Sequence, residues 1–232
     1  MPAILTGENS SPAVKQKEMM KYLGTIIESG LFDNLNRTDY MHAFEELNVI
    51  GQNMKKDDVI FHVGDKVNKI CIIDRGSVRG EKAYPNGELH IIQVYDEGNI
   101  FAIETAVSKK KTAPIDYICN EDCTVVFISL TNIDNSKFSR QIYDVLMQHM
   151  ASDNIRKMHK IEILAERGLR NRILMYLEIL HRKSGTDTVS VKMSREQLAQ
   201  YLCVNRSALS NELNKMKREK IIDFEKDQFR FL

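Results

Sequence analysis

The sequence lacks the features that mark several specialised classes of protein. Its 232 residues include only 4 prolines, 11 glycines and 4 cysteines, so it is neither a low-complexity chain nor a disulfide scaffold. No apolar run approaches the roughly 20 residues of a membrane helix, and no basic start precedes an apolar block at the N-terminus. We therefore expect no signal peptide and no membrane partner. We expect a globular protein of the reduced cytoplasm, with one large or two modest domains.

Catalytic signatures are also missing from the sequence. There is no phosphate-binding loop, no nucleophile motif, no carboxylate pair of plausible geometry and no His/Cys set with metal-ligand spacing. We therefore predict that the protein is not an enzyme and has no metal site.

Charge is unevenly distributed, although the net charge is only +1. Residues 1–165 hold 19 Lys and Arg against 23 Asp and Glu, whereas residues 166–232 hold 14 against 9. This asymmetry indicates that only the C-terminal part meets a polyanion such as a nucleic acid.

Short β-rich runs separated by single glycines occupy about residues 45–130. Pro85-Asn86-Gly87 is a hairpin turn signal, and Asn120-Glu121-Asp122 separates two further runs that we expect to form a strand pair. This spacing predicts an all-β roll or barrel, preceded by helix at about residues 15–46. The runs are Val59–Phe61, Ile70–Ile73, Ser77–Ala83, Leu89–Val94, Ile115–Cys119 and Val125–Ile128.

A long helix is predicted over about residues 136–165, because no glycine lies between Gly98 and Gly168 and no proline follows Pro114. Ser136 is its expected N-cap. Apolar residues recur along it at alternating spacings of four and three, with Asn154 as a register-setting polar residue. They predict a dimer seam, although packing of the helix twice against its own chain is the alternative. The seam comprises Met147, Ala151, Asn154, Met158, Ile161 and Ala165, and a second row facing the roll comprises Ile142, Val145, Leu146 and Met150.

Gly168 separates this helix from a second one that we expect to continue to about Arg182. A glycine between two strongly helical segments indicates a hinge and a domain boundary. The alternative is a tolerated mid-helix glycine that costs about 1 kcal/mol.

Residues 194–216 predict two helices joined by a tight turn. Ser194 and Gln197 fit a capping box, and Asn205 fits the N-cap of the second helix, with Cys203-Val204 as the corner. A hairpin follows at Ile221–Phe231, which would form a wing. A generic helical hairpin is the alternative, but the caps, the wing and the positive charge together favour DNA binding.

The second helix presents polar side chains near its N-terminus, the end that enters the major groove first. Arginine can pair with guanine, asparagine with adenine, and serine with a base or a phosphate, while alanine can contact a thymine methyl group. The predicted DNA-binding residues are Ser194, Arg195, Arg206, Ser207, Ala208, Ser210, Asn211 and Lys215.

The stretch MSREQLAQYLCVNRSALSNELNKMKREKIIDF resembles the recognition motif and wing entry of the CRP/FNR family of bacterial transcription regulators, with Lys220 in place of the usual glycine. Gly64-Asp65 and Ile73-Asp74-Arg75-Gly76-Ser77-Val78 are similar to the family's effector domain. The resemblance spans nearly the whole chain. It implies an α+β fold with a cyclic-nucleotide-binding-like β-roll (residues 1–135), a dimerisation helix (136–167) and a winged helix-turn-helix (168–232).

The resemblance also implies a homodimer on a pseudo-palindromic double-stranded DNA operator, with RNA polymerase as a further candidate partner. Arg206 matches the family's base-reading arginine. Ser207 and Asn211 stand where many members have glutamate and a second arginine, so we expect a different operator. A ligand-binding module without DNA output is the rival function.

The effector site departs from the cyclic-nucleotide pattern. Glu104 is displaced from the position of the ribose-binding glutamate, and Lys111-Thr112 only loosely matches the phosphate-binding Arg-Ser/Thr pair. We therefore expect a different small-molecule effector, an anion among the candidates, in the same pocket. The candidate pocket residues are Phe101, Ala102, Glu104, Lys111 and Thr112.

Other sensor chemistries can be weighed by residue type. The first 70 residues contain no cysteine, so an iron–sulfur cluster is not expected, and Ala102 and Glu104 stand where a haem sensor would need Cys and His. A thiol-responsive regulator is an alternative, because Cys119 and Cys123 flank a predicted turn and would approach across a hairpin. The competing interpretation is that both cysteines are small, buried residues of the strands without a redox role.

Overall fold

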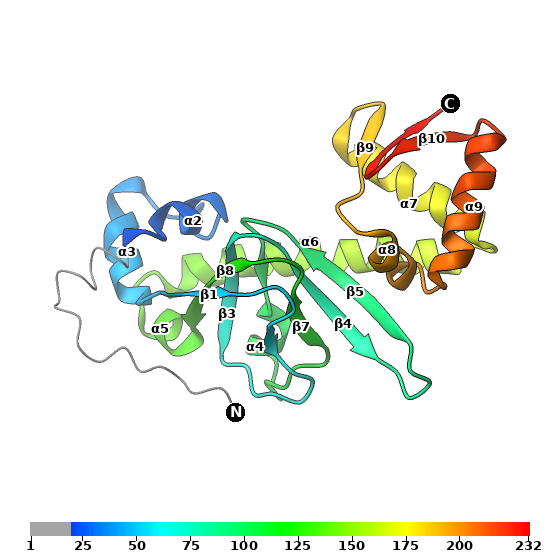
Figure 1. Cartoon of the computed structure of the whole chain (residues 1–232). Helices are drawn as coiled ribbons and strands as arrows, with labels where there is room; N and C mark the ends of the chain where they lie inside the picture. The colour runs from blue at the N-terminus through cyan, green and yellow to red at the C-terminus, as the bar shows by residue number, and fades with distance from the viewer. Residues whose placement is uncertain (1–19) are drawn as a thin grey trace. The chain divides into compact units, whose positions relative to one another are not determined.

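The computed structural model describes residues 20–232, coloured by position in Figure 1. Its first elements are α2 (Leu23–Glu28), a short 3₁₀ helix (Arg37–Asp39) and α3 (Tyr40–Leu47). They fall in the predicted helical stretch, of which residues 15–19 lie outside the described part of the chain. Thr25 in α2 donates its hydroxyl hydrogen to the carboxylate of Asp74, which fixes the helix to the strand region that follows.

Two four-stranded sheets form the β-roll, in the orders β1-β8-β3-β6 and β2-β7-β4-β5. Six of these strands lie near the predicted runs, whereas β1 and β6 match none of them, and the short helix α4 (Ile103–Val107) follows β6. Their bounds are β1 Ile50–Met54, β2 Val59–Phe61, β3 Lys69–Arg75, β4 Val78–Ala83, β5 Leu89–Tyr95, β6 Ile100–Phe101, β7 Asp116–Cys119 and β8 Cys123–Ser129.

The expected pairing of the last two strands is wrong. β7 pairs with β2, whereas β8 pairs with β1 and β3, so the chain changes sheet at residues 120–122. Six consecutive residues of β8, from Cys123 to Ile128, are buried, because both faces of this strand are covered. A strand with that burial pattern belongs in the middle of a sheet, not at the end of an exposed hairpin.

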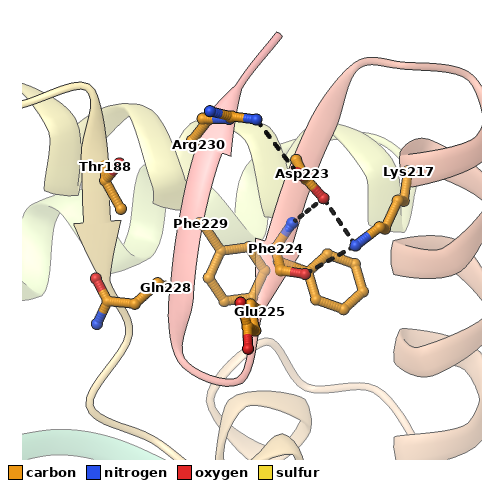
Figure 2. Close-up of a pocket in the computed structure, with 8 residues that line it drawn as sticks. All are labelled: Thr188, Lys217, Asp223, Phe224, Glu225, Gln228, Phe229 and Arg230. Atoms are coloured by element: carbon orange, nitrogen blue, oxygen red, sulfur yellow. Dashed lines mark hydrogen bonds and ion pairs between the residues drawn. The ribbon is translucent and has the colours of Figure 1, made fainter.

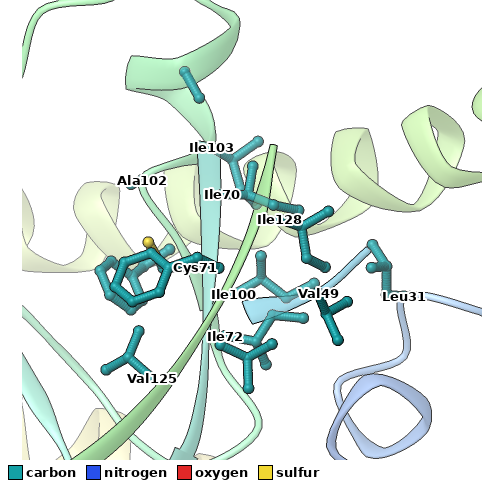
Figure 3. Close-up of a cluster of buried hydrophobic side chains, with 14 of the residues drawn as sticks. Leu31, Val49, Ile70, Cys71, Ile72, Ile100, Ala102, Ile103, Val125 and Ile128 are labelled. Carbon is teal, nitrogen blue, oxygen red and sulfur yellow. The ribbon is translucent and has the colours of Figure 1, made fainter. Parts of the chain in front are cut away.

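The core of the roll gathers apolar side chains from both sheets and from the neighbouring helices (Figure 3). Its aromatic part consists of Tyr95, Phe101 and Tyr117, whose ring centres lie 5.4 to 6.2 Å apart. All three residues are almost fully buried. Rings of this size make the largest single contributions to apolar burial, so they stabilise the roll from within.

The β4–β5 hairpin closes at the predicted turn (Figure 1). The amide of Tyr84 donates to the carbonyl of Glu88 at 2.9 Å, and that of Gly87 donates to the carbonyl of Tyr84 at 2.9 Å. Gly87 has φ of 83°, a left-handed conformation that glycine adopts at little cost.

The long helix is α6 (Ser139–Ala165), and it is preceded by the short helix α5 (Leu130–Asn135). Ser136 is not its N-cap: it ends α5, accepts a hydrogen bond from the amide of Phe138 and donates one to Glu46. The predicted inward row is confirmed, since Ile142, Val145 and Leu146 are buried and Met150 packs against the roll core.

Gly168 interrupts the helical path as predicted, with φ of 84°, and α7 (Leu169–Ser184) follows it. The remaining elements form the expected winged helix-turn-helix, with the added strand β9 (Thr188–Ser190) pairing with β11. They are α8 Arg195–Tyr201, α9 Arg206–Arg218, β10 Ile222–Glu225 and β11 Gln228–Phe231.

The chain divides into two compact units, and α6 contributes to both. One contains the described residues up to Gly80 together with Val94–Met150, and the other contains Glu81–Gln93 with Ala151–Leu232. The boundaries expected at residues 136 and 168 divide the chain by function and stay a prediction. Within residues 20–232, no helix is long and apolar enough to cross a membrane.

Candidate DNA interface

The first helix of the motif begins as the capping box predicts. The Ser194 hydroxyl accepts a hydrogen bond from the amide of Gln197 at 3.2 Å, and the Gln197 side chain accepts one from the amide of Ser194 at 2.9 Å. These reciprocal bonds satisfy two amides that the helix itself leaves without partners. Ser194 therefore positions α8 through its side chain as well as its backbone.

A tight corner joins α8 to α9. Cys203 adopts a left-handed conformation with φ of 55°, and the amide of Val204 donates to the carbonyl of Ala199 at 3.0 Å. The Asn205 side chain then caps α9 by accepting a hydrogen bond from the amide of Ala208 at 2.8 Å. Buried apolar residues hold the two helices together: Leu198, Ala199, Leu202, Leu209, Leu213 and Met216.

The N-terminal part of α9 presents most of the predicted contact residues to solvent. Arg206, Ser207, Asn211 and Lys215 are exposed, while Ala208 and Ser210 are half-buried. The Arg206 side chain is 68% exposed, and its closest carboxylate, that of Glu196, lies 4.0 Å away. Because exposed ion pairs of this kind are weak, the guanidinium group is free to exchange that partner for a base edge.

Arg195 lies in a different environment from the other predicted residues. Its guanidinium carbon lies 5.0 Å from the ring centre of Phe224 and 4.7 Å from that of Phe229, and it donates to the carbonyl of Lys226 at 2.8 Å. Burial lowers the pKa of Arg195. The structure thus places this arginine against the wing strands, apart from the exposed side chains of α9.

Two ion pairs join α7 to α9, and the sequence alone does not predict them. Arg170 donates to Glu212 and to Glu219, each at 2.6 Å. The hydrogen bond from Arg170 lowers the pKa of Glu219. These contacts hold α9 at two levels, about two turns apart along its axis.

A surface hollow lies on the wing sheet (Figure 2). Asp223 accepts from Lys217 at 2.7 Å and faces Arg230 at 3.4 Å, and Lys217 also donates to the carbonyl of Phe224. The hydrogen bond from Lys217 lowers the pKa of Asp223. The charge of Lys217 is therefore used mainly to join α9 to the wing. The hollow is lined by Thr188, Lys217, Asp223, Phe224, Glu225, Gln228, Phe229 and Arg230.

The candidate effector residues differ in their environments. Phe101 and Ala102 are fully buried in the roll core, and Glu104 is half-buried in α4. Lys111 is exposed in a loop, and the Thr112 hydroxyl accepts a hydrogen bond from Lys66 at 3.0 Å. The Lys-Thr pair is thus part of a loop closure, which does not match a preformed phosphate site.

The cysteine pair lies where the chain changes sheet. Cys119 and Cys123 are buried, and burial is the main cause that raises the pKa of Cys119 to about 12. The Cys123 thiol faces the carbonyls of Ser77 and Glu121. Buried thiols with a raised pKa react slowly, so this environment disfavours the thiol-sensor alternative. In the part of the chain that is described, no three His, Cys, Asp or Glu residues form a group that could hold a metal ion.

The predicted dimer seam lies on the exposed side of α6. All six of its residues are exposed in the single chain, and Met147, Met158 and Ile161 are 67%, 53% and 68% exposed. Ile155, beside the seam, is a further 54% exposed. Large apolar side chains in a row along a helix indicate a surface that another element covers.

Comparison with known proteins identifies both domains. Residues 51–136 match the cyclic nucleotide-binding domain, and residues 171–232 match the Crp-like helix-turn-helix domain. The chain is 25% identical over 206 residues to the probable transcriptional regulator flp of Lacticaseibacillus casei, covering 87% of this chain and 91% of that protein. It is 20% identical over 182 residues to the global nitrogen regulator of Synechococcus elongatus, covering 75% and 82%.

The fold is also found in solved structures. The c-di-GMP responsive global regulator CLP of Xanthomonas campestris aligns with a TM-score of 0.68 at 15% identity, over 82% of this chain and 98% of that one. The two matched domains occur in one chain in the order of a regulator that joins an effector domain to a DNA-binding domain. The protein therefore belongs to the CRP/FNR family of transcription regulators.

Proposed function

We propose that the protein is a homodimeric regulator that binds a pseudo-palindromic DNA operator through α9, with Arg206 as its principal base-reading residue. The observation that carries this proposal is the exposed N-terminal part of α9, where Arg206 stands beside exposed Ser207 and Asn211. Two such helices in a dimer would enter successive major grooves, about one helical turn apart.

The dimer is proposed to form along α6. The exposed seam supplies apolar side chains at coiled-coil spacing, and Asn154 provides a polar position that can set the register. The wing, with exposed Lys226 and Arg230, would lie against the phosphate backbone. RNA polymerase is proposed as a further partner, which the protein would contact when it acts as an activator.

The effector is proposed to be a small molecule other than a cyclic mononucleotide. Lys111 is exposed and Thr112 is bonded to Lys66, and this supports an effector without a cyclic phosphate. The regulator CLP, whose fold is similar, is described as c-di-GMP responsive, and this supports an effector other than a cyclic mononucleotide. Native mass spectrometry of the purified protein would detect a retained molecule, and binding of cyclic AMP or cyclic GMP at micromolar concentration would contradict this part of the proposal.

Arg206→Ala tests the DNA-binding assignment. An operator is first selected from random duplexes, and affinity is then compared between that operator and a scrambled duplex. We expect the variant to lose about 1–3 kcal/mol of discrimination, because a bidentate arginine–guanine contact is worth that much. Arg182→Ala, an exposed arginine in the last turn of α7, is the matched control for the loss of one positive charge. Full operator selectivity in Arg206→Ala would refute the assignment.

A further inference from the structure

Lys160 on α6 is a buried cation that contacts two other elements of its unit. The residue is only 7% exposed. Its amino group donates to the main-chain carbonyl of Ile91 and lies 3.4 Å from that of Ile92, both on β5. The same group lies 4.1 Å from the centre of the Tyr201 ring, at the end of α8. One side chain thus meets a strand of the β4–β5 hairpin and the first helix of the DNA-binding motif.

Stability alone does not explain a lysine at this position. Burial is the main cause that lowers the pKa of Lys160 to about 8, from an ordinary value of 10.5. The contacts of its amino group given above are with neutral partners, namely two carbonyl oxygens and the face of a ring. An apolar side chain of similar length would fill the space without removing a charge from water. An amine at this position therefore points to a role in directing contacts between elements.

The surroundings of Lys160 on the same helix are polar and incompletely satisfied. Asp153, two turns earlier, is 1% exposed, and its carboxylate accepts from Arg156 and lies 3.4 Å from the Gln93 amide nitrogen. One oxygen of Asp153 and the side-chain oxygen of Gln93 are buried without a hydrogen-bond partner. Buried polar atoms without partners cost free energy, so a shift of β5 against α6 that gave them partners would be favourable.

Strand β5 also continues into the core of the roll. Its last residue, Tyr95, packs its ring 5.4 Å from that of Phe101, and both lie within the residues that match the cyclic nucleotide-binding domain. Ile91, which bonds to Lys160, lies four residues earlier on the same strand. A paired strand transmits displacement along its length, so movement at Tyr95 reaches the carbonyls that hold Lys160.

We propose that Lys160 is a coupling residue that transmits displacement of β5 to Tyr201 and so to the helix-turn-helix. Movement of α8 would reorient the corner at Cys203 and the start of α9. The regulatory meaning of this link rests on the function proposed above. The link itself can be measured without DNA or effector, so its failure is distinguishable from failure of DNA binding.

Hydrogen exchange measured by mass spectrometry tests the coupling on the full chain. Tyr95→Leu perturbs β5 from the roll side, and the readout is the exchange rate of the amides in Arg195–Tyr201. In the parent protein we expect Tyr95→Leu to raise this rate about three- to tenfold, in the range of known coupling energies. In a Lys160→Met background the same substitution should leave α8 exchange unchanged, while exchange in β5 still rises.

Two further variants make the result decisive. Tyr201→Leu breaks the same link from its other end, so it should also abolish the response of α8, and it replaces Lys160→Met if that variant fails to fold. Lys183→Met is the matched control, because it removes an exposed lysine from the end of α7 and should preserve the response. An equal response in the Lys160→Met background, or no response of α8 in the parent, would overturn the proposal.

Discussion

The guanidinium carbon of Arg195 lies 4.7 Å from the centre of the Phe229 ring. The same group donates to the carbonyl of Lys226, in the turn between β10 and β11. A cation over an aromatic face is attracted by the ring quadrupole, and more strongly when both are shielded from water. This contact joins the start of α8 to the wing.

Arg195→Met should therefore destabilise the protein, whereas Arg206→Ala should not. We expect the free energy of unfolding to fall by about 1–2 kcal/mol for Arg195→Met, because the rings lose a cation and the Lys226 carbonyl loses its donor. Urea unfolding followed by circular dichroism measures the difference. Equal stability of the two variants would show that Arg195 contributes little to the wing.

If the seam on α6 is the dimer interface, one carboxylate introduced into it should separate the subunits. Ile161→Glu places a carboxylate on a residue that is 68% exposed in the single chain and that the dimer would bury. We expect the mass measured by light scattering to fall from that of two chains to that of one.

Ile50→Glu is the matched control for this prediction. Ile50 is 63% exposed on the edge strand β1 and is not a residue of the seam, so its substitution should leave the mass unchanged. A dimer that persists in Ile161→Glu would place the subunit interface elsewhere.

The environment of the four cysteines predicts an order of reactivity. Cys203 is half-buried at the helix-turn-helix corner, while Cys71, Cys119 and Cys123 are buried. Because burial raises the pKa of Cys71 and Cys119, few of their thiols are ionised at neutral pH. We expect a thiol-reactive disulfide reagent to modify Cys203 first in the native protein, and all four thiols in denaturant. Rapid modification of the three remaining thiols in a Cys203→Ser variant would support the thiol-sensor alternative.

The local parts of the DNA-binding site could be predicted from the sequence. The bonds that cap α8 and α9 join residues only three apart, Ser194 with Gln197 and Asn205 with Ala208, so their residue types are visible in the sequence. The exposed seam of α6 follows in the same way from helical periodicity. These predictions depend on hydrogen bonds and burial patterns within one or two turns of a helix.

The contacts that position these parts could not be predicted, because they join distant residues. Lys160 lies 69 residues from Ile91, and Arg170 lies 42 residues from Glu212. The change of sheet between β7 and β8 depends on which strands cover Cys123 to Ile128, and a turn signal at residues 120–122 cannot determine that. The effector pocket has the same difficulty, since the packing of Phe101 against Tyr95 and Tyr117 depends on the folded roll.

Lys220 stands where the family usually has glycine, and its conformation explains that preference. Its φ is 58°, and the amides of Lys220 and Ile221 donate to the carbonyls of Lys217 and Met216, the pattern that ends many helices with a left-handed residue. A side chain in this conformation is strained, so Lys220→Gly should raise the free energy of unfolding by about 0.5–1 kcal/mol.

Lys215→Gly is the matched control for this last prediction, since it places glycine inside α9, where it should lower the free energy of unfolding by about 1 kcal/mol. Thermal and urea unfolding of both variants measure whether each substitution raises or lowers the free energy of unfolding. If both substitutions destabilised the protein equally, the left-handed conformation of Lys220 would not be a source of strain. A higher free energy of unfolding for Lys220→Gly and a lower one for Lys215→Gly would show that the chain tolerates a strained helix end where α9 leads into the wing.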